Sequence, residues 1–216
     1  PEIAVATTKA YSTQLVLMDL VGLYLADLLG TVEQSEYDTI LSEMQLLPEK
    51  MRQFLSHTED IQYYASRYFN HDSIFFIGRN LDYAMGLEGS LKLKEISYIH
   101  SEAYTAGELK HGPISLLEDG TLVIAIATYE KLFDKMMSNV REVKARGAVV
   151  LGITVRGKEE ALKQETDYQF CVPDITDFML PSLSILPLQL FAYYVASMKG
   201  CDIDKPRNLA KSVTVE

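Results

Sequence analysis

Ionisable side chains are concentrated between residues 87 and 113. Glu88, Lys92 and Glu95 stand at i, i+4 and i+7, so a helix places them on one side. His111 follows in a Gly-Glu-Leu-Lys-His-Gly-Pro segment, where two glycines and a proline impose an irregular backbone. Two carboxylates, an amine and an imidazole so close in the sequence can transfer a proton on a small polar substrate.

The same spacing also has a simpler interpretation. A Glu/Lys ladder at i, i+4 is most often a solvated helix face, in which each pair contributes a few tenths of a kcal/mol. A histidine between glycines is more suggestive, but spacing alone does not separate a functional residue from a surface one. Periodicity therefore supports a candidate acid/base site and nothing more specific.

Alternating strands and helices surround this stretch. Apolar runs at residues 73–77, 121–127, 149–155 and 168–172 predict buried strands, and helices are expected between them, including one over 131–146 that Gly147 closes. A short extended piece is expected between the helix of residues 87–97 and the histidine loop. Strands that are apolar throughout indicate a parallel sheet covered on both faces. Such sheets bind ligands at the carboxyl ends of their strands, where the turn at residues 78–80 lies.

Helices dominate the two ends of the chain. A helix that starts near residue 8 and stops at Gly30 is apolar around nearly its whole circumference, so we expect it to be buried by more than one neighbour. Two amphipathic helices are expected over 34–71, divided near Pro48 or at residues 56–58, as a connector. Residues 181–200 predict another very apolar helix, with Pro187 inside it. The polar tail, residues 202–216, predicts coil on the surface.

Composition narrows the classes of partner. The chain has 216 residues and a formal net charge of −10, so we expect neither nucleic acid nor an anionic membrane surface as a partner. Cys171 and Cys201 form no ligand-like pair, and no Cys/His cluster has metal spacing. We therefore expect no metal, no cofactor, and a reducing, cytoplasmic setting. The apolar run at 15–29 is too short to span a bilayer.

Three blocks of the sequence resemble a known family. LEGSLKLKEISYIHSEAYTAGELKHGP, the final PRNLAKSVTVE and the opening PEIAVATTKAYSTQ are similar to the isomerase half of the glutamine:fructose-6-phosphate amidotransferases, also called glucosamine-6-phosphate synthases. That half consists of two sugar-isomerase (SIS) subdomains. The resemblance covers essentially the whole chain in colinear order, and it implies a three-layer αβα SIS fold with a parallel sheet flanked by helices.

The resemblance implies catalytic roles at three positions. Glu95 matches the carboxylate that moves a proton between C1 and C2 of the sugar. His111 matches a histidine linked to opening of the fructose ring, which the family supplies across a dimer interface. Lys211 matches the lysine that forms an imine with the open-chain ketose.

Five further positions match substrate contacts of the family. Glu88 and Lys92 match residues that contact or position the substrate beside Glu95. Val5 and Ala210 match backbone contacts. Thr7 stands where the family often has a serine near the substrate, and this difference keeps the hydroxyl.

The resemblance also implies a division of the chain and a set of partners. We expect the end of a first SIS subdomain at 1–30, a helical connector at 31–72, a second SIS subdomain at 73–200 and a catalytic tail at 201–216. The implied substrate is fructose 6-phosphate and the product is glucosamine 6-phosphate, made by a homodimer with ammonia from a glutaminase domain. Because the phosphate-binding loop of the first subdomain is absent, we expect these residues alone to be inactive and to bind the sugar phosphate poorly.

Three other readings remain open. The first is another phosphosugar isomerase or a deglycase, against which the lysine of the NLAKSVTVE tail argues. The second is a non-catalytic sugar-phosphate-binding SIS module, which needs neither Glu95 nor Lys211. The third is a purely structural dimerisation core, which is compatible with the enzyme.

Overall fold

A parallel β-sheet forms the centre of the molecule. In the computed structural model, which describes residues 3–210, five strands pair in the order β2-β1-β3-β4-β5, and every pairing is parallel. The strands are β1 (Ser73–Gly78), β2 (His100–Thr105), β3 (Leu122–Ile126), β4 (Val149–Val155) and β5 (Tyr168–Val172). The predicted parallel sheet is confirmed.

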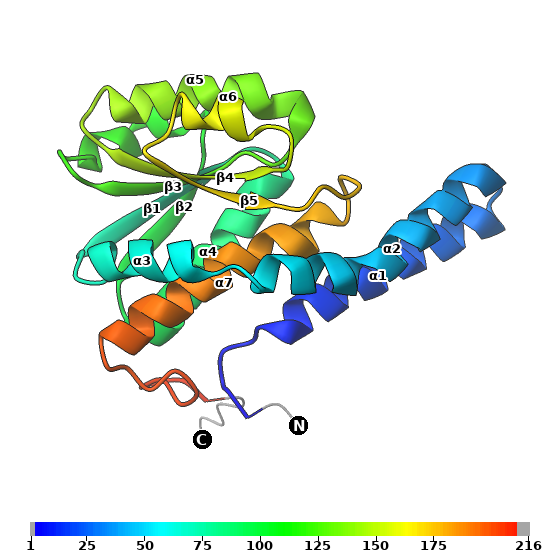
Figure 1. Cartoon of the computed structure of the whole chain (residues 1–216), viewed down its shortest axis with the longest axis horizontal. Helices are drawn as coiled ribbons and strands as arrows, with labels where there is room; N and C mark the ends of the chain where they lie inside the picture. The colour runs from blue at the N-terminus through cyan, green and yellow to red at the C-terminus, as the bar shows by residue number, and fades with distance from the viewer. Residues whose placement is uncertain (1–2, 211–216) are drawn as a thin grey trace.

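Helices cover both faces of this sheet (Figure 1). On one face lie α3 (Glu59–Tyr68), α4 (Leu81–Ser97) and α7 (Leu180–Met198), and on the other lie α5 (Phe133–Lys144) and α6 (Glu159–Lys163). The connections contain the short 3₁₀ helices η1 (Leu109–His111), η2 (Pro113–Leu116) and η3 (Glu130–Leu132). The result is the three-layer αβα architecture that the sequence predicts.

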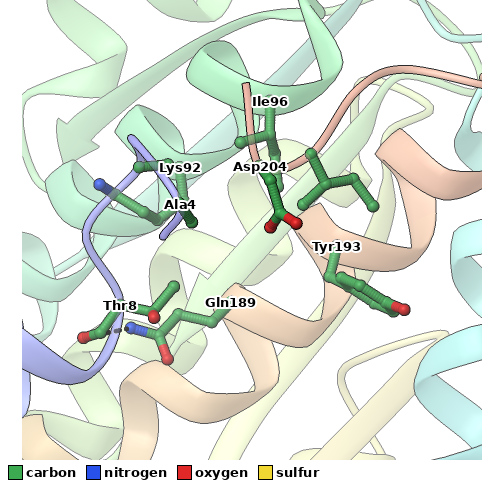
Figure 2. Close-up of a pocket in the computed structure, with 9 residues that line it drawn as sticks. Ala4, Thr8, Lys92, Ile96, Gln189, Tyr193 and Asp204 are labelled. Atoms are coloured by element: carbon green, nitrogen blue, oxygen red, sulfur yellow. Dashed lines mark hydrogen bonds between the residues drawn. The ribbon is translucent and has the colours of Figure 1, made fainter. Parts of the chain in front are cut away.

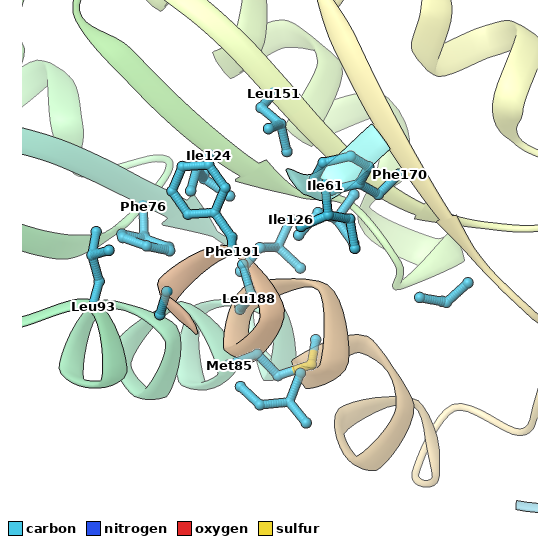
Figure 3. Packing of buried hydrophobic residues seen from close by; sticks show 14 of the residues in the cluster. Ile61, Phe76, Met85, Leu93, Ile124, Ile126, Leu151, Phe170, Leu188 and Phe191 are labelled. Carbon is cyan, nitrogen blue, oxygen red and sulfur yellow. The ribbon is translucent and has the colours of Figure 1, made fainter. Parts of the chain in front are cut away.

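Neighbouring residues of one strand belong to two separate cores. Phe76 and Ile124 face α4 and α7, where they join the larger cluster that Figure 3 shows. Phe75 and Val123, one position earlier in each strand, join the cluster beneath α5 and α6. This alternation follows from the two-residue period of a strand. Each fully buried Phe or Ile stabilises the fold by about 1.5–3 kcal/mol, so both helical layers are held firmly.

The strand β2 is a member of the sheet, where the sequence predicts only a short extended piece. Its residues, HSEAYT, lack the continuous apolar run of the other strands. It lies at the sheet edge and pairs only with β1 among the strands of residues 3–210. Its buried Ser101 exchanges hydrogen bonds with Ser90 of α4. An edge strand has fewer apolar neighbours, which explains why its sequence is polar.

The helix α1 (Lys9–Leu28) contradicts one expectation. The sequence predicts burial by more than one neighbour, but among its residues only Leu23 is buried. The helix and its partner α2 (Gln34–Leu55) project from the body of the molecule (Figure 1). An apolar stripe on α1 is exposed, with side chains at i, i+4, i+7, i+8 and i+11: Leu17, Val21, Tyr24, Leu25 and Leu28. Residues 3–210 contain no element that covers this stripe.

The helix α7 is the main element packed on α4. A Cβ atom at Gly89 of α4 would lie 2.6 Å from Leu188 Cδ1 of α7, so the two helices approach closely because that residue is glycine. Pro187 lies inside α7 and is buried. Among the described residues, α7 alone has the length and apolar composition of a membrane span, and 67% of the relevant window is buried inside the protein. These properties fit a core helix.

The helices expected as a connector divide at residues 56–58, where α2 ends and α3 begins; Pro48 lies within α2. Ile61 and Ala65 of α3 are buried in the core against the sheet and α7. The division of the chain into subdomains stays a prediction. The tail from residue 199 to 210 contains no helix or strand, as the sequence predicts for the part described here.

Candidate active site

The predicted turn at residues 78–80 positions the start of α4. A Cβ atom at Gly78 would lie 2.5 Å from the carbonyl carbon of Asp82, so only glycine fits this approach. The buried Asp82 accepts hydrogen bonds from the backbone N–H groups of Thr128 and Tyr129 and from the Thr128 hydroxyl. These contacts fix the first turn of α4 to the carboxyl end of β3.

Three ionisable residues of α4 form the centre of the site. Lys92 Nζ lies 2.6 Å from Glu95 Oε2 and 3.4 Å from Glu88 Oε1. The contact with Glu95 is an ion pair without hydrogen-bond alignment, because Glu95 Oε2 has no hydrogen-bond partner among residues 3–210. Only 4% of Lys92 is exposed. The ladder is therefore not a solvated helix face: it is a largely buried ammonium between two carboxylates.

Burial changes the protonation equilibrium of Glu88 in this carboxylate–ammonium triad. It raises the pKa of Glu88 above its ordinary value; the Lys92 ammonium opposes that rise, and the charge of Glu95 adds to it. Tyr11 of α1 lies near enough that Glu88 contributes to its raised pKa of about 12, although burial is the larger cause. The charge of the triad is therefore felt at Tyr11, whose phenol stays neutral at physiological pH.

A cavity of about 200 Å³ lies beside Lys92 (Figure 2). The N-terminal stretch contributes Ala4, Ala6 and Thr8 to its walls, and α7 contributes Gln189 and Tyr193. Gln189 Nε2 donates a hydrogen bond of 3.3 Å to the backbone oxygen of Thr8, which ties the N-terminal stretch to α7. This cavity is mostly apolar in character, with the lysine as its cationic group.

A second, larger cavity of about 500 Å³ lies beside Glu95. Its walls come from the end of α4 and from the tail, and they include Lys94, Tyr98, Arg207 and Asn208. Lys94 and Arg207 bring positive charge to this cavity, which suits an anionic metabolite. Glu95, between this cavity and Lys92, is placed to act on a ligand held there.

The predicted substrate contacts lie near these cavities. Val5 is half-buried, and its backbone N–H donates to the backbone oxygen of Asp204, 2.9 Å away. Thr7 is half-buried between two residues that line the first cavity, Ala6 and Thr8. Ala210 is exposed and follows Leu209, which lines the second cavity. Lys211 lies outside the described residues.

The structure does not bring His111 to Glu95 within one chain. Glu95 precedes β2 and His111 follows it, and a strand of six residues spans roughly 17 Å. His111 is exposed in η1 at the carboxyl end of the sheet, whereas Glu95 lies toward the amino end. The candidate acid/base group is therefore not at the carboxyl edge, where the topology favours ligands. Arg79 at that edge is hydrogen-bonded to Asn139 instead.

Sequence reasoning missed several residues of the site. Gln189 and Tyr193 belong to an apolar helix whose periodicity indicates only core, and Asp204 belongs to a tail without periodicity. Tyr98 and Arg207 are joined only by folding, since 109 positions separate them. No local spacing signals a contact of this kind.

The site and the fold agree with the comparison with known families. A model of the SIS domain matches residues 67–199. The chain belongs to the SIS domain family. The match starts at the end of α3 and ends just after α7, so it contains the whole parallel sheet.

Two curated relatives align with this chain over its whole length. It is 52% identical over 216 residues to the glutamine--fructose-6-phosphate aminotransferase [isomerizing] of Clostridium acetobutylicum, and it is 45% identical to the enzyme of the same name from Thermococcus kodakarensis. In both cases the alignment covers all of this chain and 35% of the relative. The chain thus spans about a third of the length of the curated relatives it matches.

A solved structure also resembles this chain over nearly its whole length. The C-terminal domain of glucosamine-fructose-6-phosphate aminotransferase from Francisella tularensis superposes with a TM-score of 0.91 at 35% identity, over 95% of this chain and 57% of that one. This chain is therefore similar to part of the C-terminal domain of that aminotransferase.

Proposed function

We propose that this chain is the sugar-isomerising part of a glutamine--fructose-6-phosphate aminotransferase. The observation that carries the proposal is the buried Lys92 between Glu88 and Glu95, beside two cavities. It occurs in a chain that is 52% identical over its whole length to an enzyme of that name. The substrate would be fructose 6-phosphate and the product glucosamine 6-phosphate.

The residue types support a stepwise mechanism. The Lys211 amine condenses with C2 of the open-chain ketose, which releases water and leaves an imine whose neighbouring C1 proton is more acidic. Ammonia then displaces the Lys211 amine from C2, which frees the lysine and leaves the imine of ammonia at C2. The Glu95 carboxylate takes a proton from C1 and returns it to C2 while the C1 hydroxyl loses its proton, so C1 becomes the aldehyde and C2 keeps the new amine. Lys92 and Glu88 hold the carboxylate in place, and the Lys92 ammonium offers a positive charge to a negatively charged oxygen of the sugar.

The proposal includes partners that supply what this chain does not bring together. A homodimer would donate His111 of one protomer to the site of the other, where it assists opening of the sugar ring. A glutaminase domain would deliver ammonia. The distance between His111 and Glu95 within one chain supports this arrangement. Free thiols at Cys171 and Cys201 support a cytoplasmic setting. Poor sugar-phosphate binding by these residues alone stays a prediction.

Replacing one carboxylate tests the proposal. In the full-length protein that contains this chain, Glu95→Gln removes the proton acceptor and keeps the shape, so we expect formation of glucosamine 6-phosphate to fall by at least about a hundredfold. Glu160→Gln, on the exposed face of α6, is the matched control and should change nothing. Near-normal turnover of Glu95→Gln would contradict the proton-transfer role.

The alternative of a non-catalytic sugar-phosphate-binding module predicts a different result. In that case Glu95→Gln would leave sugar-phosphate binding intact, and no product would form even with the unaltered protein. Calorimetric titration with fructose 6-phosphate, measured beside the product assay, separates the two functions. The buried carboxylate–ammonium group favours the enzyme, because binding a sugar phosphate does not require a carboxylate such as Glu95 held against a buried ammonium beside the cavity.

A further inference from the structure

The loop that carries His111 follows β2 and stays attached to the carboxyl edge of the sheet. The backbone N–H of Ala106 donates a hydrogen bond of 2.8 Å to the backbone oxygen of Gly78, the last residue of β1. Three residues later, the Leu109 side chain is buried in the core beneath α5 and α6. These two attachments leave Gly107, which lies between them, to be held by another contact.

That contact is made with Arg79. A Cβ atom at Gly107 would lie 3.0 Å from Arg79 Nη2 and 3.5 Å from Nη1 and Cζ of the same side chain. The backbone of Gly107 is outside the left-handed region, so its conformation does not require glycine. Space requires it: a methyl group would already be tight here, and a larger side chain would push the loop away from the guanidinium.

The guanidinium is itself fixed by α5. Arg79 Nε and Nη2 donate hydrogen bonds of 3.0 and 2.8 Å to Asn139 Oδ1. Asn139 is buried, and its Nδ2 donates a hydrogen bond of 3.0 Å to Glu142 Oε2 on the next turn of the helix. Two donors on one acceptor fix the orientation of a planar group as well as its position. A continuous set of contacts therefore runs from α5 through Asn139 and Arg79 to the loop.

The shape of Arg79 is used here more than its charge. The side chain is half-buried, and within residues 3–210 it makes no ion pair. The neutral amide of Asn139 accepts both of its hydrogen bonds. A lysine could not reproduce this arrangement, because its ammonium is a single point on a flexible stem. The rigid guanidinium plane is thus the surface against which Gly107 lies.

We propose that Arg79 is a positioning residue, which fixes the loop of residues 106–111 and so presents His111 for opening of the sugar ring. The inference rests on the proposed function, in which His111 has that role. Arg79 acts only through the loop and touches no reacting atom. A loop held at three points samples few arrangements, so its imidazole is offered at a defined place.

The first test measures the loop without any activity. Arg79→Met keeps the aliphatic stem and removes the guanidinium. The backbone N–H groups of Glu108 and His111, which close turns within the loop, should then exchange with deuterium at least threefold faster in the full-length protein. Arg146→Met is the matched control, because Arg146 also bonds to α5, at the Glu142 backbone oxygen, but follows the helix at the amino edge of the sheet. Unchanged exchange in Arg79→Met would overturn the proposal.

The second test separates ring opening from the later steps. 5-Deoxyfructose 6-phosphate lacks the hydroxyl that closes the furanose ring, so it stays open-chain and does not need the histidine. In the full-length protein, we expect Arg79→Met to lower kcat for fructose 6-phosphate by at least about tenfold and to leave kcat for the open-chain analogue within about twofold of the unaltered protein. A general disturbance of the fold would lower both. An equal loss on both substrates, or no loss on either, would overturn the proposal.

Two further variants complete the test. Gly107→Val displaces the loop from the guanidinium without removing a hydrogen bond of Arg79, so it should give the same selective loss even if Arg79→Met folds poorly. His111→Asn separates the two levels of the argument. If it lowers turnover of both substrates equally, or of neither, the proposed role of His111 is wrong. If its loss is selective while Arg79→Met and Gly107→Val have no effect, only the positioning inference is wrong.

Discussion

Lys92 gives the clearest result at the scale of single residues. The sequence places it correctly on one side of a helix with Glu88 and Glu95, because i, i+4 and i+7 spacing fixes that geometry. Spacing cannot show whether the side faces water or protein. Burial decides the question, since only 4% of the lysine is exposed. A buried ammonium is retained only when paired charges compensate its loss of hydration.

Removing the lysine should therefore destabilise the fold. Lys92→Met keeps the length of the side chain but leaves two carboxylates side by side, and we expect the free energy of unfolding to fall by about 2–3 kcal/mol. The loss should be smaller in acid than at neutral pH, because burial raises the pKa of Glu88 and a protonated Glu88 no longer repels Glu95. Urea denaturation measures both values. Lys94→Met, at the exposed neighbouring position, should change stability by less than about 0.5 kcal/mol; an equal effect of the two substitutions would contradict the burial argument.

Asp82 gives a prediction about pH. Burial raises the pKa of this carboxyl to about 6, against opposing hydrogen bonds from Thr128 and Tyr129, and the charge of Asp177 raises it further. A folded-state pKa above the unfolded value means that its stabilising contribution is complete below about pH 4 and is lost as pH rises through about 6.

Comparison with Asp82→Asn isolates this contribution. Between pH 4 and pH 7 the unaltered protein should lose up to about 3 kcal/mol that the variant does not lose. Asn cannot accept all three hydrogen bonds, so the variant is less stable at every pH, and the informative quantity is the difference in slope. Guanidinium denaturation at several pH values gives the free energy of unfolding as a function of pH for each protein, and the slopes of the two curves are compared. Parallel slopes would show that Asp82 stays ionised throughout.

At the scale of elements, the sequence predicts what local patterns encode. Continuous apolar runs identify β1, β3 and β4 because these inner strands are buried on both faces. One edge strand, β5, is recognised from its aromatic and apolar residues although it is only partly buried. The edge strand β2 lacks such a run and is recognised only as an extended piece. Apolarity predicts burial of α1, yet burial depends on what packs against a helix. The separation of Glu95 from His111 also depends on the direction in which β2 runs between them. Local sequence patterns do not predict that direction.

The turn between β1 and α4 contains a strained residue. Asn80 has φ 54° and ψ −123°, a combination that glycine adopts readily and other residues avoid. Asn80→Gly should therefore stabilise the protein by about 1 kcal/mol, less the extra entropy of glycine in the unfolded chain. Differential scanning calorimetry would show a higher melting temperature. A lower melting temperature would mean that the Asn80 side chain contributes more than its backbone strain costs.

At the scale of the whole molecule, the exposed stripe on α1 is the feature that residues 3–210 leave uncovered. Its side chains repeat with the period of a helix and lie on a helix that projects from the body. Aligned with the Francisella tularensis domain, the chain matches 57% of that structure. We expect the stripe to be covered, in the longer protein, by the remaining part of the same domain, because an exposed apolar row of this kind is otherwise unfavourable.

The chain studied alone should then associate through this stripe. Sedimentation velocity of the 216-residue chain should show oligomers whose proportion rises with concentration, since a second copy offers the nearest apolar surface. Tyr24→Glu/Leu28→Lys replaces two residues that are 62% and 67% exposed by a Glu/Lys pair at i, i+4, which supports the helix while it removes apolar area. The double variant should be monomeric with unchanged circular dichroism. If the unaltered chain stays monomeric at high concentration, the stripe does not drive association. Its apolar side chains would then remain in contact with water even where a second copy is available to cover them.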